Sequence, residues 1–236
     1  IFAQLGDRLA KHVGVDLRPY GATRGDRLRA KDSPIAATAA QVADGLGVGD
    51  LDVYLSPRQP WVMIAEPTSP PSLVIGAELA KLGASAVRFA AGGALVLARA
   101  SLSIPLRLPP DELAVLVVAM ARLFQPDFPS RGAADDAVAT QVQKLRRLIP
   151  SGLMNDLRPY ALALDGGSLE VTGLAAGLRA AAYRAGLVAS GALAAGLAAI
   201  AGQAGIHGGP AAALDHPDAA DLVQFAVGED HAALVG

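Results

Sequence analysis

The sequence predicts an α+β fold that is predominantly α-helical, with a small two- to three-stranded sheet packed on a helical bundle. Apolar residues recur at helical spacing from residue 84 onward, whereas β-branched and aromatic residues cluster between residues 51 and 75. The 236 residues are 52% hydrophobic but only 4% aromatic, so the core is expected to consist of closely packed helices rich in small residues. We expect one domain over residues 1–236, with an N-terminal helix and linker over 1–32 and a helical C-terminal half over 109–236.

The predicted sheet lies in the first half of the chain. Short strands are expected at Leu51–Leu55 and Trp61–Glu66, joined as a hairpin through the loop SPRQP. The apolar run Leu73–Ile75 predicts a third strand. Asp52 and Glu66 are interpreted as exposed strand positions, because no partner base stands at a spacing that would pair with them.

Helical patterns fill most of the remaining sequence. They predict helices over residues 1–14, 35–46, 84–100, 111–124, 133–148, 151–164, 174–189, 192–204 and 218–225. Ser33 and Pro34 form a good helix start, and the acidic pair Asp111 and Glu112 favours the positive end of a helix dipole. The uncharged stretch 186–206 is as long as a membrane span, but its Ala and Gly content favours a buried helix pair.

Charge and cysteine content exclude several classes of function. The net charge of −2 gives no general attraction for nucleic acid or anionic membranes, so neither is an expected partner. Because there is no cysteine, the chain has no disulfide, no thiol nucleophile and no cysteine-ligated metal. Cytoplasmic localisation is the default expectation. The first residue is Ile1 rather than Met, so we expect a fragment of a longer protein.

Catalytic and metal-binding motifs are missing from the sequence. None of the four histidines has the spacing of a pre-formed metal site, and the nearest cluster, His207, Asp215 and His216, is interpreted as solvated loop residues. The nucleophile elbow and the phosphate-binding loop are also absent. The basic run Lys144–Leu148 is interpreted as a solvated helix face, with a partner-binding patch as the alternative.

The stretch VRFAAGGALVLARA, residues 87–100, and the later stretch YRAGLVASG, residues 183–191, carry one family resemblance. A helix, a short sheet, a helix at VRFAAGG and a later helix with RAGLxASG resemble the gluzincin metallopeptidases of the CAAX-prenyl-protease and HtpX group. The resemblance covers residues 33 to 203 and implies a zincin-like fold. In that family the first of these helices carries HExxH, whose two His bind Zn²⁺ while the Glu activates the bound water.

The residues at the matching positions cannot perform that chemistry. The resemblance places Gly93, Ala94 and Leu97 at the first His, the Glu and the second His, and Arg179 at the Glu that is the third ligand. Tyr183 stands where the family has an Asp. The resemblance therefore implies a domain without catalytic residues, metal or cofactor.

We accordingly expect a non-catalytic pseudo-metallopeptidase domain that acts as a protein-interaction or scaffold module. Its partner would be another protein or other domains of the same longer chain. The resemblance implies a peptide-groove strand, which here comprises Trp61, Val62, Met63, Ile64 and Glu66. Two alternatives stay open: an enzyme of another class, such as a hydrolase with a non-zinc pocket built from Tyr160, Tyr183, Glu66 or the histidine-bearing loop, and a membrane-associated helical module.

Overall fold

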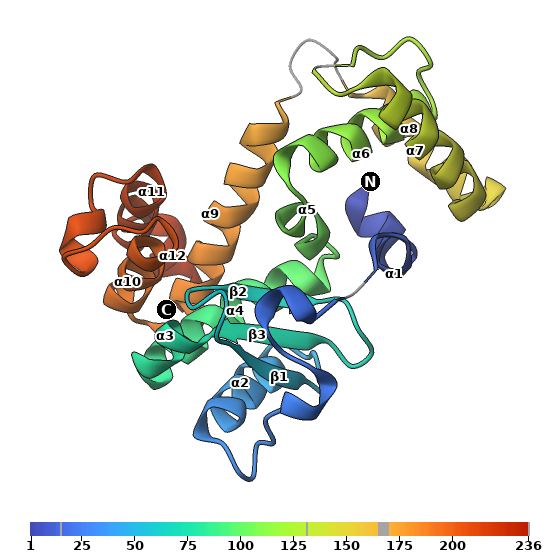
Figure 1. The fold of residues 1–236 in the computed structure, drawn as a ribbon. Helices are drawn as coiled ribbons and strands as arrows, with labels where there is room; N and C mark the ends of the chain where they lie inside the picture. Colours follow the sequence, from blue (N-terminus) through green and yellow to red (C-terminus); the bar gives the residue numbers. More distant parts are fainter. Residues whose placement is uncertain (15, 131, 165–169, 236) are drawn as a thin grey trace. The chain divides into compact units, whose positions relative to one another are not determined.

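The computed structural model describes residues 1–14, 16–130, 132–164 and 170–235. The chain forms two compact units, one made of Ile1–Gly14 with Ile104–Gly177 and the other of Val15–Ser103 with Leu178–Gly236 (Figure 1). We call them the helical unit and the sheet unit. The sequence predicted a single domain over residues 1–236, and this remains a prediction.

The helical unit contains α1 (Phe2–Val13), α6 (Pro110–Arg122), α7 (Asp135–Leu148) and α8 (Ser151–Leu162), and α5 (Ser103–Arg107) begins at its boundary. Each helix turns one apolar face inward, and Leu9, Leu113, Leu145 and Leu157 are fully or almost fully buried in a common core. The acidic residues of the first turn of α6 are confirmed at its N-terminus.

The sheet unit is built on three strands, β1 (Asp52–Ser56), β2 (Met63–Glu66) and β3 (Ser72–Gly76), in the order β1-β3-β2. β3 pairs with β1 in parallel and with β2 antiparallel. The predicted hairpin of the first two strands is therefore wrong. All five residues of β3 are buried, and a strand covered on both faces is best placed between two others.

Helices cover one face of this sheet and the N-terminal loop covers the other. α2 (Pro34–Gly45) and α4 (Ala84–Arg99) share a core with Val53, Ala65 and Leu73, while α3 (Ala77–Lys81) directly follows β3. On the opposite face, Tyr20 packs with Tyr54 and Val74. Two 3₁₀ turns in that loop are η1 (Arg18–Tyr20) and η2 (Arg24–Asp26).

The C-terminal part of the chain is helical, as predicted. It contains α9 (Val171–Ser190), α10 (Leu193–Gln203), η3 (Pro210–Ala213), α11 (Pro217–Ala226) and α12 (Glu229–Val235). The stretch 186–206 forms the expected helix pair, which breaks at Gly191, where φ is +62°. Among the described residues, no helix has the length and apolar character needed to cross a membrane. The short helices α3, α5 and α12 were missing from the sequence prediction.

Candidate functional site

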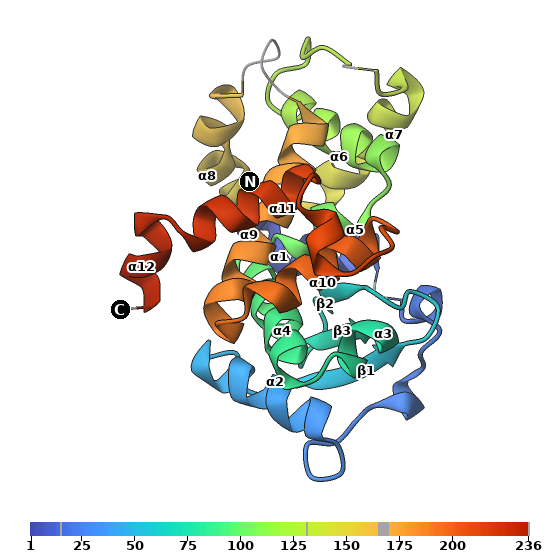
Figure 2. The same ribbon diagram turned by 90° about the vertical axis from the view of Figure 1, so that its left-hand side faces the viewer.

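Gly93 lies where α4, β2 and the C-terminal half of α9 meet. A Cβ atom placed on Gly93 would lie 2.5 Å from the carbonyl oxygen of Ala182 in α9 and 2.6 Å from Met63 Cε in β2. Both distances are far shorter than an ordinary contact between such atoms. The position assigned by the resemblance to the first zinc-binding His therefore has no room for any side chain. Figure 2 shows α4 and the C-terminal half of α9, with α10 beside them.

The contact between α4 and α9 is lined by small residues on both helices. A Cβ on Gly92 would collide with Ala189, and one on Gly186 would lie 2.6 Å from the carbonyl oxygen of Phe89. Gly therefore lets the two backbones approach much closer than larger residues would allow. Phe89 is fully buried, and its ring stacks on Tyr183 with 6.2 Å between the ring centroids.

The other positions that the resemblance assigns to the zinc motif are buried or ion-paired. The side chains of Ala94 and Leu97 on α4 are buried. Arg179 on α9 is half-exposed and forms an ion pair with Asp218 of α11 at 3.3 Å. A second ion pair, Arg184 with Asp221, joins the same two helices. The guanidinium at position 179 is thus held by a carboxylate of its own unit.

Tyr183 is the remaining position and it connects α9 to the segment before β2. Its hydroxyl donates a hydrogen bond to Gln203 Oε1 at 2.6 Å, and Gln203 Nε2 donates to the carbonyl oxygen of Trp61 at 3.1 Å. The indole of Trp61 packs against Gly202 of α10. Burial raises the pKa of Tyr183, and the carboxylate of Asp218 raises it further, so this phenol is neutral at pH 7.

The predicted groove strand is the edge strand β2, but little of it is accessible. The Gly76 amide donates to the carbonyl oxygen of Val62 at 2.7 Å, so by antiparallel alternation the backbone groups of Met63 and Ala65 face away from β3. Ala65 is fully buried, whereas Met63 is half-buried. An added strand would therefore reach this edge only beside Met63.

Glu66 corrects a sequence prediction. It is fully buried rather than exposed, and its Oε1 accepts a hydrogen bond from the hydroxyl of Tyr20 at 2.9 Å. Its register opposite Ser72 places it on the sheet face that the N-terminal loop covers, away from Gly93. Of the residues named for the alternative enzyme pocket, Glu66 and Tyr183 lie on opposite faces of the sheet, and Tyr160 belongs to the helical unit.

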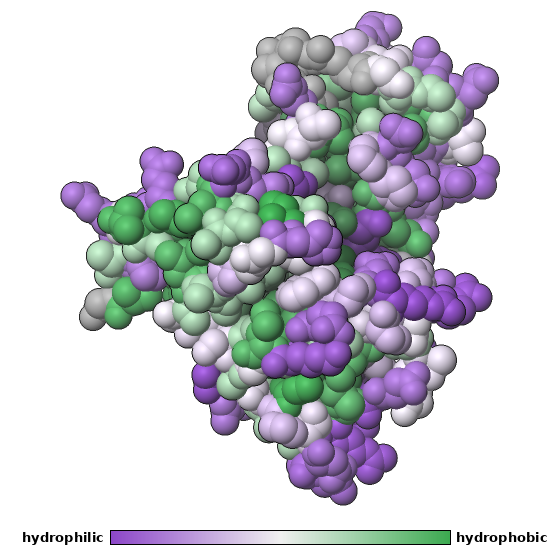
Figure 3. Space-filling view, turned by 60° about the vertical axis from the view of Figure 1, so that its left-hand side comes forward, coloured by the Kyte–Doolittle hydropathy of each residue, from purple (hydrophilic) through white to green (hydrophobic). Residues whose placement is uncertain are grey.

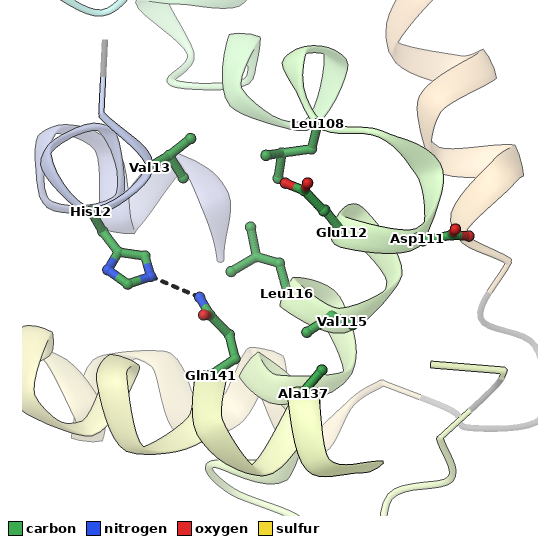
Figure 4. Close-up of a pocket in the computed structure, with 9 residues that line it drawn as sticks. All are labelled: His12, Val13, Leu108, Asp111, Glu112, Val115, Leu116, Ala137 and Gln141. Carbon is green, nitrogen blue, oxygen red and sulfur yellow. Dashed lines mark hydrogen bonds between the residues drawn. The ribbon is translucent and has the colours of Figure 1, made fainter. Parts of the chain in front are cut away.

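A pocket of about 350 Å³ in the helical unit had no signal in the sequence (Figure 4). His12 of α1 and Gln141 of α7 are joined across it through a 2.8 Å hydrogen bond between their side-chain nitrogens. The carboxylate of Glu112 lies on the α6 side, whereas that of Asp111 points away. Since α1 lies far from α6 and α7 in the sequence, only tertiary packing creates this pocket.

No group of three or more His, Asp or Glu side chains is placed to hold a metal ion in the described part of the chain. His207 is exposed, and the ring of His216 accepts a hydrogen bond from the Asp218 amide at the start of α11. His207 and Asp215 are thus solvated, as interpreted from the sequence, whereas His216 is partly buried and caps α11.

Apolar side chains are exposed on the C-terminal helices of the sheet unit. Figure 3 shows hydrophobic surface on these helices, which form the left-hand part of that view. Val227, Leu234 and Val235 are 82%, 64% and 55% exposed there.

Comparison with protein-family models, with curated proteins and with solved structures finds no match for this chain. The fold is mostly helical with a three-stranded mixed sheet, and the site predicted from the resemblance is a packed helix crossing.

Proposed function

We propose that the sheet unit is a non-catalytic, zincin-like module whose function is to bind a protein or another domain of a longer chain. The observation that carries this proposal is the closed contact at Gly93. In the metallopeptidases that the sequence resembles, a motif-bearing helix, an edge strand and a later helix surround the zinc. Here α4, β2 and α9 meet at one point, and the backbone of α9 leaves no room for a side chain at residue 93.

Further features of the same unit support a binding role over a catalytic one. The polar side chains nearest the crossing already have partners. Tyr183 is hydrogen-bonded to Gln203, Gln203 to the carbonyl oxygen of Trp61, and Arg179 is ion-paired with Asp218. The exposed aliphatic residues Val227 and Leu234 provide apolar surface that a partner would cover, with a gain of roughly 25 cal/mol for each Å² of apolar area buried.

Metal content and hydrolysis test the non-catalytic part. The protein is loaded with Zn²⁺, passed through a desalting column, and measured for bound zinc and for cleavage of unfolded casein. We expect much less than one bound zinc per chain. We also expect no chelator-sensitive cleavage of casein. One zinc per chain, lost together with a chelator-sensitive peptidase activity, would refute the proposal.

Partner capture tests the binding part. Val227→Glu with Leu234→Glu places two charges on the proposed surface, whereas Leu82→Glu, at a 49% exposed residue on another part of the unit, is the matched control. We expect the double variant to lose a partner that the wild type and the control retain. Equal retention by all three proteins would show that this surface is not the binding site.

A further inference from the structure

The loop-covered face of the sheet holds a second and larger cavity, of about 770 Å³. It is formed entirely within the sheet unit, by the N-terminal loop, the starts of β1 and β3, and the link between β2 and β3. Its charged lining residues are Arg18, Arg24, Arg27, Arg29, Asp16 and Asp52. Four guanidinium groups thus face two carboxylates in a chain whose net charge is −2.

The two carboxylates are already used by two of the arginines. Arg18 binds Asp16 at 2.9 Å, and Arg27 binds Asp52 at 2.8 Å. The side chains of Arg24 and Arg29 have no hydrogen-bond or ion-pair partner among the residues that the structure describes.

The nearest acidic residue in sequence is not free to neutralise Arg24. Asp26 Oδ2 accepts hydrogen bonds from the Thr23 amide at 2.8 Å and from the Thr23 hydroxyl at 2.7 Å, which fixes the turn η2. These bonds lower the pKa of Asp26 and hold its carboxylate on Thr23. The cavity therefore keeps two guanidinium groups that form no ion pair with the described residues.

The backbone directs these arginines toward the same face. Leu28 pairs with Val53 on the outer edge of β1, so Arg27 and Arg29, on either side of Leu28, project to the side opposite Leu28. Arg27 reaches Asp52, which marks the loop-covered face.

The sheet and the link add neutral hydrogen-bonding groups to the cationic ones. Tyr54, Thr68, Ser69 and Ser72 line the cavity with hydroxyls, and the Thr68 hydroxyl donates to Ser72 Oγ at 2.7 Å. Tyr54 and Ser72 are almost fully buried, so their positions are fixed by the sheet. The guanidinium forks of Arg24 and Arg29 beside these hydroxyls supply N–H donors from two side chains.

We propose that this cavity binds a small molecule bearing a phosphate group, through Arg24 and Arg29 with support from the hydroxyls of the sheet. A phosphate group accepts hydrogen bonds on three oxygens, and the planar fork of arginine matches two of them at once. The volume lies within the range of small-molecule sites. The site is on the opposite face of the sheet from the Gly93 crossing, so it is independent of the proposed protein-binding function.

Isothermal titration calorimetry with pyrophosphate and with glycerol 3-phosphate tests this proposal. We expect saturable binding that weakens as salt rises, because the contacts are between charges. The double variant R24A/R29A should bind about a hundredfold more weakly, since two charge-assisted contacts are lost. R146A/R147A, which removes two exposed arginines of α7, is the matched control and should bind like the wild type.

Each alternative source of binding gives a distinct result. Absence of binding by the wild type, or equal binding by R24A/R29A with an unchanged fold by circular dichroism, would overturn the proposal. So would citrate binding as tightly as pyrophosphate, because it carries comparable charge without phosphate. Sedimentation with vesicles containing phosphatidic acid, without binding of either soluble phosphate, would also overturn it in favour of a membrane surface.

Discussion

Replacement of Gly93 by alanine tests the packed crossing directly. The added Cβ would stand 2.5 Å from the Ala182 carbonyl oxygen, whereas such atoms normally lie about 3.5 Å apart, so the backbone of α9 has to move by about 1 Å. Overpacking of this kind costs about 1–3 kcal/mol, and the cost lies at the upper end because the obstructing atom belongs to a helix backbone. Because alanine favours the helix over glycine by up to about 1 kcal/mol, the substitution offsets part of this cost. We therefore expect a net loss of about 2 kcal/mol in the free energy of unfolding.

The assay uses the single tryptophan of the chain. Trp61 packs against Gly202 within the sheet unit, so its fluorescence reports unfolding of that unit even if the two units melt separately. Urea titration should show an earlier midpoint with an unchanged slope, and the melting temperature should fall by about 4–8 °C.

Gly45→Ala is the control for Gly93→Ala, because Gly45 is the last residue of α2 and a Cβ there meets nothing within 4 Å. It should leave stability unchanged or raise it by up to about 1 kcal/mol. If Gly93→Ala is as stable as the wild type under conditions where Gly45→Ala behaves as expected, the close approach of α4 and α9 is refuted.

Three further predictions concern burial and charge. Phe89→Ala should cost about 3–5 kcal/mol, measured by the same urea titration, because it empties a fully buried site between α4, α9 and α10; a loss below about 1 kcal/mol would contradict that packing. Burial raises the pKa of Tyr183 in the folded state, so the stability that the neutral phenol contributes is complete below pH ~10 and is lost as pH rises further. The difference in melting temperature between the wild type and Tyr183→Phe should therefore shrink above pH ~10. Parallel curves of melting temperature against pH would contradict this burial. The Ser130 hydroxyl, and next the Arg122 guanidinium, lower the pKa of Asp135, so the stability that the Asp135 carboxylate contributes is present above pH ~4 and is lost below it. Asp135→Asn should therefore lose less stability on acidification than the wild type. An identical loss of stability with falling pH would contradict the contacts of Asp135 with Ser130 and Arg122.

Local signals in the sequence predicted the longer helices well. Ser33 accepts a hydrogen bond from the Ala36 amide and Pro34 begins α2, as their types indicate. The helices that the prediction missed have five to seven residues, too few to show an apolar period. Such short segments become helical through the structure on either side of them.

Strand pairing was beyond the reach of these local signals. Neighbours in sequence favour a hairpin, but β3 separates β1 from β2 because its unbroken apolar run requires cover on both faces. The run Leu73–Ile75 carried this information, since a strand with apolar residues at successive positions is buried on both sides. The burial of Glu66 follows from the same arrangement, as the N-terminal loop covers the face to which it points.

The sequence by itself determined the helix-rich class, the position of the sheet and the absence of catalytic side chains at residues 93, 94 and 97. Composition and periodicity are local properties, and the chemistry of a side chain is present before the chain folds. Only the tertiary structure decided that the backbone of α9 closes over Gly93, and that Arg24 and Arg29 meet the hydroxyls of the sheet. Both are contacts between segments far apart in the chain, and their geometry depends on packing that no local pattern encodes.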